Sequence, residues 1–118
     1  MILAHCGGAL PALAWRVTHL AEAATSRQAQ PVKEADVREA LSKLYFDTAL
    51  SATDPVLTAA MAVSGADHLL FGTDSGAASE AVIESNIAGL VASSLSPEQR
   101  VGVNRGNAAD VFTRRLQH

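Results

Sequence analysis

The chain has 118 residues, of which 48% are hydrophobic and 18% are charged, and this composition excludes an intrinsically disordered protein. Its formal net charge of −3 gives no reason to expect nucleic acid or an anionic membrane surface as a partner. No uncharged run reaches the roughly 18 residues that a membrane-spanning helix needs, so we expect one domain over residues 1–118 that is not inserted in a membrane.

Three short apolar runs, at residues 1–4, 44–46 and 69–71, predict β-strands. None of them alternates cleanly with polar residues, which is the pattern of parallel strands buried on both faces. The segments between the strands predict helices, and this alternation is typical of βαβ units in a parallel α/β sheet. Two architectures fit the order: a small doubly wound sheet, and a piece of an eight-stranded barrel.

The first strand runs into the sequence His-Cys-Gly-Gly. We do not interpret this start as a signal peptide, because it has no basic n-region and because His5 and Arg16 interrupt the apolar segment. Cys6 is the only cysteine, which excludes an intrachain disulfide and fits a reducing compartment, so we expect a cytoplasmic protein. A nucleophilic Cys6 is one interpretation, but we favour a small buried thiol, since neighbouring strand residues point to opposite faces.

Prolines and glycines predict the bounds of the two middle helices. Pro31 can open one helix, whose apolar residues keep the i, i+3, i+4, i+7 spacing of a buried stripe. These residues are Val37, Ala40, Leu41 and Leu44. A second helix is expected to have Asp54 as its N-cap, Pro55 at its first position and Gly65 at its end.

Two more helices are expected after the third strand, with a capping box between them. The long helix is marked by the apolar residues Ile83, Ile87, Leu90 and Val91. Ser96 is the expected N-cap of the next segment, with Pro97 in the first turn and Gln99 as the capping-box partner. Asn107 is expected to cap a final helix whose inward-facing residues are Ala108, Val111 and Phe112.

Each predicted strand leads to a polar residue: His5, Asp47 or Asp74. Because the carboxyl ends of the strands form the active face in both architectures, we expect all three residues there. An ionised Asp74 at this mouth is costly unless it meets a metal, a cation or hydrogen-bond donors. The alternative interpretation is that Asp74 caps the next helix. His5 and Asp47 also have purely structural interpretations, and Arg16 in the following helix is ordinarily solvent-exposed.

Three segments in series, "LAHCGGALPALAWRV", "LYFDTALSATDPVLTAAMAVSGADHLLFGTDSG" and "RGNAADVF", resemble the C-terminal part of the amidohydrolase-related metal-dependent decarboxylases. The fold of that family is a (β/α)8 TIM barrel, and the resemblance implies strands six to eight with their helices. A complete barrel takes about 250 residues, so the resemblance implies a C-terminal fragment of the fold.

The resemblance also implies roles for three residues. His5 matches the family's catalytic histidine at the end of strand six, and Asp74 matches the catalytic, metal-ligating aspartate at the end of strand eight. Arg16 matches an arginine that, in some members, crosses a homodimer interface to hold a substrate carboxylate. The implied cofactor is a divalent metal, most simply zinc, with manganese as the alternative. Trp15 and Arg16 then form an association surface, unless Trp15 merely packs the first helix onto the sheet.

The chain departs from the family pattern in three ways. The family often has a third glycine where this chain has His-Cys-Gly-Gly. Ser75 and Gly76 stand where the family usually has an aromatic residue and a proline. The His-x-His pair of strand one and the histidine of strand five have no counterpart, and we do not expect the other histidines to replace them. Those histidines are His19, His68 and His118.

The sequence therefore predicts a decarboxylase of an aromatic or unsaturated carboxylic acid, present as a C-terminal fragment. We expect this fragment alone neither to bind zinc tightly nor to turn over a substrate. Two alternatives remain open. In the first, the parent enzyme is an amidohydrolase-type hydrolase of a lactone or amide, because the same metal site activates water. In the second, the chain is a remnant without activity.

Overall fold

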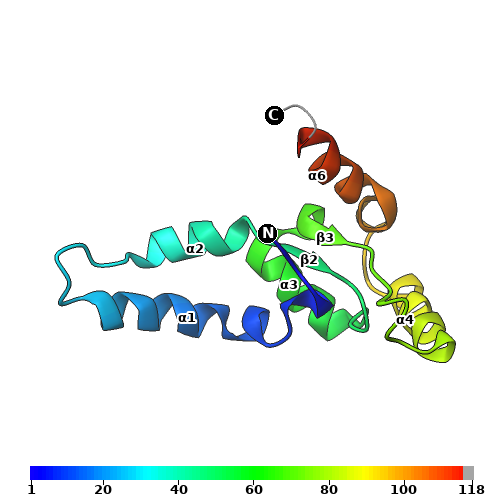
Figure 1. Ribbon diagram of the computed structural model, residues 1–118, viewed down its shortest axis with the longest axis horizontal. Helices are drawn as coiled ribbons and strands as arrows, with labels where there is room; N and C mark the ends of the chain where they lie inside the picture. Colours follow the sequence, from blue (N-terminus) through cyan, green and yellow to red (C-terminus); the bar gives the residue numbers. More distant parts are fainter. Residues whose placement is uncertain (116–118) are drawn as a thin grey trace.

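The computed structural model describes residues 1–115 of the chain, which form a three-stranded sheet with helices around it (Figure 1). The strands are β1 (Ile2–Leu3), β2 (Tyr45–Asp47) and β3 (Leu69–Leu70). The α-helices are α1 (Leu10–Thr25), α2 (Glu34–Ser42), α3 (Asp54–Ser64), α4 (Glu80–Ala92), α5 (Pro97–Val101) and α6 (Asn107–Arg115). Short helical turns η1 (His5–Gly7), η2 (Ala66–His68) and η3 (Gly102–Gly106) connect them.

The sheet has the order β1-β2-β3, and both strand pairs are parallel, which confirms the predicted parallel α/β arrangement. Tyr45 is paired with Ile2, and Phe46 with Leu69. Phe46 is fully buried and both residues of β3 are buried, as expected for covered strands. The expectation is wrong for β1, where Ile2 is 39% exposed. Both β1 and β3 are edge strands, but η3 packs against β3.

The core lies between the sheet, α3 and the segments after β3. Its buried members are Cys6, Phe46, Ala52, Leu57, Ala60, Leu69, Leu90, Leu95 and Val103. Val103 comes from η3, where its carbonyl accepts a hydrogen bond of 3.0 Å from the Phe71 amide and so extends the pairing beyond β3. No helix among the described residues is long and apolar enough to cross a membrane.

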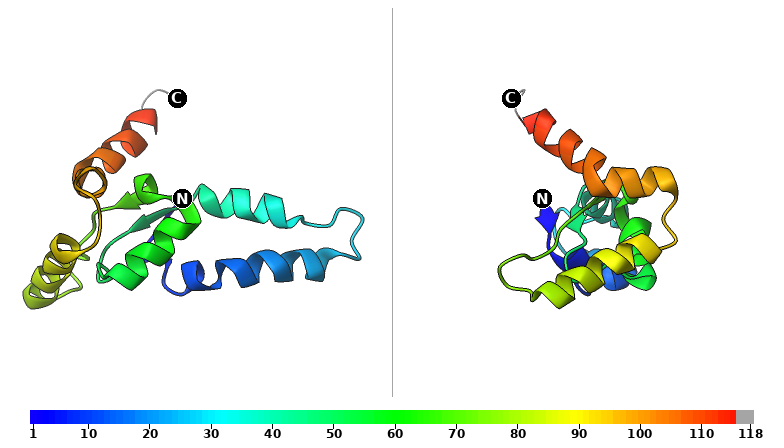
Figure 2. Two further views of the ribbon diagram at one scale, coloured as in Figure 1. Left: turned by 180° about the vertical axis from the view of Figure 1, so that it is seen from behind. Right: turned by 90° about the vertical axis from the view of Figure 1, so that its right-hand side faces the viewer.

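The molecule is elongated because α1 and α2 form a hairpin that projects from the sheet, while α4 and α6 lie on the other side (Figures 1 and 2). Its radius of gyration is 16.0 Å, whereas a compact domain of this length has about 13.5 Å. Its accessible surface is 7489 Å², against roughly 6,100 Å² for a compact monomer of this mass. The described residues therefore leave more surface open than a self-contained domain does.

The helix α2 begins at Glu34, so the prediction that Pro31 opens it is wrong. The preceding segment reaches back to the end of α1 before the helix starts. The Val32 amide donates to the Thr25 hydroxyl at 2.8 Å, and the Glu34 amide donates to the Glu22 carboxylate at 3.0 Å. The predicted apolar stripe of α2 is only half-buried, and Ala40 within it is exposed.

Two expected helix caps are wrong, because each side chain bonds to a distant segment instead. The N-cap of α3 is Thr53, and the Asp54 carboxylate accepts hydrogen bonds from the amide (2.7 Å) and hydroxyl (3.0 Å) of Ser94. Asn107 continues the helix from η3, and its buried amide donates to the carbonyls of Ala66 (2.9 Å) and Leu69 (2.7 Å).

Other boundary predictions are confirmed. Gly65 ends α3 with a φ of 89°, and its amide donates to Met61. Ser96 and Gln99 form the complete capping box at the start of α5. In α6 Val111 is buried, but Phe112 is 55% exposed, so the expectation that it faces inward is wrong.

Candidate functional site

The three segments that follow the strands meet at the carboxyl end of the sheet, and we call them the strand-end loops (residues 4–9, 48–53 and 71–79). Because the strands are neighbours and parallel, His5, Asp47 and Asp74 lie at this end, as predicted. Positive φ angles in described residues other than glycine occur only here: His5 (55°), Cys6 (51°), Leu50 (54°) and Asp74 (58°). Such angles cost about 1–2 kcal/mol each, and strained backbone of this kind clusters at functional sites.

His5 and Cys6 lie in the tight turn η1 rather than in a strand, and the turn sends their side chains to opposite environments. His5 is exposed, whereas Cys6 is fully buried, which confirms the buried thiol. Burial, and secondarily the negative charge of Asp47, raises the pKa of Cys6 to about 12, so the thiol stays protonated. A Cβ on Gly7, whose φ is 74°, would lie 2.7 Å from the Phe46 ring, so only glycine fits there.

Asp47 joins the first two strand-end loops. Its Oδ1 accepts hydrogen bonds from the backbone amides of His5 (2.9 Å) and Ala49 (3.1 Å). The His5 ring then contacts the Ala49 carbonyl through Nδ1 at 3.1 Å. The structural interpretation of Asp47 is therefore confirmed, and its bonding partners include the predicted catalytic residue.

Asn86 of α4 joins the second and third strand-end loops, and sequence reasoning missed it. Its Oδ1 accepts hydrogen bonds from the amides of Ser51 and Ala52, both at 3.0 Å, and its Nδ2 donates to the Gly72 carbonyl at 3.3 Å. Thr48 adds a link, because its hydroxyl accepts from the Gly72 amide at 3.3 Å. The available signal was a lone asparagine among the apolar residues of a helix, since an amide that becomes buried there needs partners.

Asp74 is half-buried in the third strand-end loop, and its carbonyl accepts from the amides of Ala77 (3.1 Å) and Ala78 (3.0 Å). It does not cap the next helix, because the N-cap of α4 is Ser79, so that alternative is wrong. No group of three or more His, Cys, Asp or Glu side chains among the described residues is placed to hold a metal ion. Asp74 can supply one ligand, but the described residues do not fit a complete metal site.

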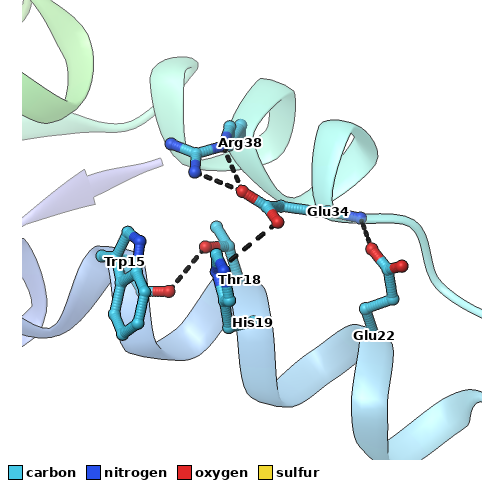
Figure 3. A network of polar contacts seen from close by, with 6 residues as sticks. All are labelled: Trp15, Thr18, His19, Glu22, Glu34 and Arg38. Carbon is cyan, nitrogen blue, oxygen red and sulfur yellow. Dashed lines mark hydrogen bonds and ion pairs between the residues drawn. The ribbon is translucent and has the colours of Figure 1, made fainter.

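The predicted substrate anchor, Arg16, is not in the strand-end loops. It is exposed on α1, and no carboxylate of residues 1–115 forms an ion pair with it. The adjacent Trp15 is 64% exposed and stacks on His19 with ring centroids 4.2 Å apart (Figure 3). Trp15 therefore does not pack onto the sheet, and that alternative is wrong.

The hairpin of α1 and α2 is held by a polar network centred on Glu34 (Figure 3). The Glu34 carboxylate pairs with Arg38 and lies 3.5 Å from Nδ1 of His19. The Arg38 hydrogen bond, helped by the His19 and Arg38 charges, lowers the pKa of Glu34. A hollow of about 550 Å³ between α1, α2 and α3 is lined partly by Trp15, Thr18 and Arg38 and by none of the strand-end residues.

The remaining histidines are away from the strand ends. His19 belongs to the hairpin network, and His118 lies outside the described residues. His68 is at the amino end of β3, where it stacks on Tyr45 and its Nδ1 donates to the Leu44 carbonyl at 2.8 Å. Neither His19 nor His68 therefore lies with His5 and Asp74 at the carboxyl end of the sheet.

The chain is similar to known proteins in both sequence and structure. Residues 1–114 match the model of an amidohydrolase family. The 6-methylsalicylic acid decarboxylase of Penicillium expansum is 33% identical over 97% of this chain and 35% of its own length. The structure of 2,6-dihydroxybenzoate decarboxylase complexed with 2,6-dihydroxybenzoate superposes with a TM-score of 0.76 and 26% identity, over 95% of this chain and 34% of that one.

A further similar structure is a dihydroxybenzoic acid decarboxylase from Polaromonas sp. JS666 with bound manganese and the inhibitor 2-nitroresorcinol. Its TM-score is 0.76 and its identity 25%, over 95% of this chain and 33% of that one. The chain thus spans about one third of the length of the relatives that it matches.

Proposed function

The chain belongs to the amidohydrolase family, and from that premise we propose that it is the C-terminal part of a metal-dependent decarboxylase acting on an aromatic or unsaturated carboxylic acid. The relatives named above are decarboxylases of aromatic acids, which supports this reaction over hydrolysis. The observation that carries the proposal is the gathering of His5, Asp74 and the strained backbone at one end of the parallel sheet.

We assign β1, β2 and β3 to strands six, seven and eight of a (β/α)8 barrel, with residues 1–118 as one partial segment of it. The parallel order of neighbouring strands supports this assignment. The large accessible surface supports it too, since the outer edges of a three-stranded piece are covered in a closed barrel. In such a barrel the strand-end loops form the mouth where substrate binds.

In decarboxylation the bond from carbon to the carboxylate breaks, CO2 leaves, and the electron pair stays on the carbon, which then takes a proton. His5 is proposed as the general acid/base, because imidazole exchanges its proton near neutral pH. Asp74 is proposed as a metal ligand that can also carry a proton to that carbon. Arg16 is proposed to hold a substrate carboxylate by two hydrogen bonds, across a homodimer interface.

The proposed ion is divalent, with zinc expected from the family resemblance and manganese favoured by the Polaromonas relative. Asp74 would supply one ligand, and the other ligands would have to come from outside the described residues. Titration of the 118-residue chain with zinc or manganese, followed by calorimetry, should therefore show no tight binding, since affinity comes from several ligands held together. Submicromolar one-to-one binding would contradict this ligand assignment.

A chimera tests the activity. Residues 1–114 of this chain would replace the matched third of the Penicillium expansum 6-methylsalicylic acid decarboxylase. We expect the chimera to release CO2 from 6-methylsalicylic acid, and we expect His5→Ala and Asp74→Asn to abolish the release. Asp67→Asn is the matched control for Asp74→Asn, because it changes the same residue type at an exposed position outside the strand-end loops. Turnover that survives His5→Ala, or a folded chimera without turnover, would contradict the proposal.

The same chimera tests the proposed homodimer. Sedimentation of the unmodified chimera is compared with that of a variant carrying Trp15→Ala and Arg16→Ala. The exposed Trp15 beside an exposed arginine is the composition enriched where proteins pair, so we expect the variant to dissociate. A dimer unchanged by both substitutions would remove this surface from the proposal.

A further inference from the structure

We propose that Asp47 is the positioning residue of this site, and that it sets both the orientation and the tautomer of the His5 imidazole. The inference rests on the proposed role of His5 in proton transfer and deepens it. The Asp47 carboxylate does not contact the His5 ring. Instead, the carboxylate accepts the backbone amides of His5 and of Ala49, the residue whose carbonyl contacts the ring. Its effect on the ring is therefore indirect.

One oxygen atom makes both backbone contacts. Oδ1 of Asp47 accepts the His5 amide at 2.9 Å and the Ala49 amide at 3.1 Å. The ring of His5 completes a closed loop of contacts, because its Nδ1 lies 3.1 Å from the carbonyl of the same Ala49. Hydrogen bonds to an ionised carboxylate are about twice as strong as those between neutral groups. Asp47 therefore fixes the main chain of His5 relative to the carbonyl that its ring contacts.

The backbone around His5 needs such a restraint. His5 and Cys6 both have left-handed φ angles, 55° and 51°, which side-chain-bearing residues rarely adopt. At about 1–2 kcal/mol each, this turn persists only where neighbouring contacts hold it. The bond from the His5 amide to Asp47 is a contact of this kind, and it bridges residues 42 positions apart. The closeness of the carboxylate also contributes to the raised pKa of Cys6.

The contact with Ala49 determines which ring nitrogen carries the proton. A carbonyl oxygen only accepts hydrogen bonds, so Nδ1 of His5 must be the donor. In the neutral ring Nε2 is then the basic nitrogen, free of its proton and able to take one from, or return one to, a reacting group. Without Asp47 the ring would lose its fixed distance to Ala49, and the other tautomer would become accessible.

Nitrogen NMR of the histidine rings in the 118-residue chain tests this inference without any activity. The spectra are recorded well above the ordinary imidazole pKa of about 6.5, where the ring is neutral. We expect His5 to be the Nδ1–H tautomer in the wild type and in Asp47→Asn, which keeps an Oδ1 acceptor. We expect Asp47→Ala to shift His5 toward the Nε2–H tautomer.

His68 is the internal control, because its Nδ1 also donates to a carbonyl, at the opposite end of the sheet, and should stay Nδ1–H in all three proteins. An Nε2–H tautomer of His5 in the wild type or in Asp47→Asn overturns the inference, and if Asp47→Ala does not fold in the 118-residue chain, the same three spectra are recorded in the chimera. A folded Asp47→Ala variant with unchanged His5 also overturns it. Failure of the chimera to turn over would leave these spectra unaffected, so the two proposals fail separately.

Discussion

The strand-end loops and the hairpin of α1 and α2 are both held by polar contacts, but the contacts differ in kind. The loops are bonded by Asp47 and Asn86, which each accept two backbone amides, and three of these four amides come from segments distant in sequence. Asn86 is also buried. In the hairpin, Glu34 pairs with the exposed guanidinium of Arg38 and contacts the exposed ring of His19. Exposed ion pairs contribute little to stability, whereas a buried amide left unpaired is costly.

The difference indicates which region is built to hold a fixed geometry. The loops contain the left-handed residues and the candidate site, and their bonds connect all three strand ends. The hairpin contains Arg16 and exposed apolar residues, as an outer surface does. We therefore regard the loops as a preorganised site and the hairpin as a peripheral element whose exposed face is available for the proposed subunit contact.

The largest expected difference between the regions is in thiol reactivity. Burial raises the pKa of Cys6 to about 12, so at mildly alkaline pH the folded chain should react with a thiol reagent on the order of 1,000-fold more slowly than the unfolded chain. The control is Cys6→Ala with Ala24→Cys, which places the thiol on the exposed end of the hairpin and should react freely. Comparable rates for the two thiols would contradict the buried assignment.

The same pKa predicts how stability depends on pH. The thiol titrates near 9 when exposed and near 12 when folded, so the folded chain binds more protons in between. Its contribution to stability is complete below pH 9 and is lost as the pH rises toward 12. Urea denaturation across this range should show falling stability in the wild type and a smaller fall in Cys6→Ala.

Removal of the Asn86 side chain should give the largest loss of stability in the loops. Asn86→Ala leaves the amides of Ser51 and Ala52 without their acceptor, and we expect a loss of about 2–4 kcal/mol in the free energy of unfolding. Asn104→Ala is the matched control at an exposed asparagine, and it should change little. Urea denaturation measures the free energy of unfolding of both variants. Equal losses in Asn86→Ala and Asn104→Ala would contradict the expected difference between a buried and an exposed amide side chain.

Gly89 of α4 should respond to alanine in the direction opposite to an ordinary helical glycine. A Cβ at this position would lie 2.3 Å from the Ala52 carbonyl oxygen, so we expect Gly89→Ala to cost about 1–3 kcal/mol. At Gly106 the nearest atom to a Cβ is 3.9 Å away, so Gly106→Ala should be neutral or stabilising. Thermal unfolding of the two variants measures the sign, and a stabilised Gly89→Ala would refute the close contact.

The smallest effect is expected from the hairpin. Arg38→Ala removes the partner that lowers the pKa of Glu34, and because the pair is exposed the unfolding midpoint should shift only slightly. The contribution of a lowered carboxyl pKa is complete above the ordinary value of 4.5 and is lost as the pH falls through the lowered pKa. Wild type and variant should therefore converge in acid. A loss as large as that of Asn86→Ala would show that the hairpin is also a tightly held element.

The order of the elements and the end of the sheet that carries the site could be predicted from the sequence. Short apolar runs that lead to His5, Asp47 and Asp74 carry this information locally, because parallel strands bring their carboxyl ends together. The capping box of Ser96 and Gln99 was also predictable, since both partners lie within one helical turn.

What could not be predicted depends on contacts between distant residues. Asp54 and Asn107 have the local pattern of caps, yet their side chains bond to segments about 40 residues away. Asn86 was missed for the same reason, and the tautomer of His5 depends on a carbonyl 44 positions along the chain. Local spacing does not specify which distant backbone group a polar side chain reaches.

Native-state hydrogen exchange of backbone amides tests the central distinction most directly. The amides bonded to Asp47 and Asn86, those of His5, Ala49, Ser51 and Ala52, are compared with the amides of Val32 and Glu34 in the hairpin. We predict that the loop amides exchange only with a free energy close to that of global unfolding, while the hairpin amides exchange through a smaller local opening. Loop amides that exchange as readily as those of the hairpin would contradict a preorganised site at the strand ends.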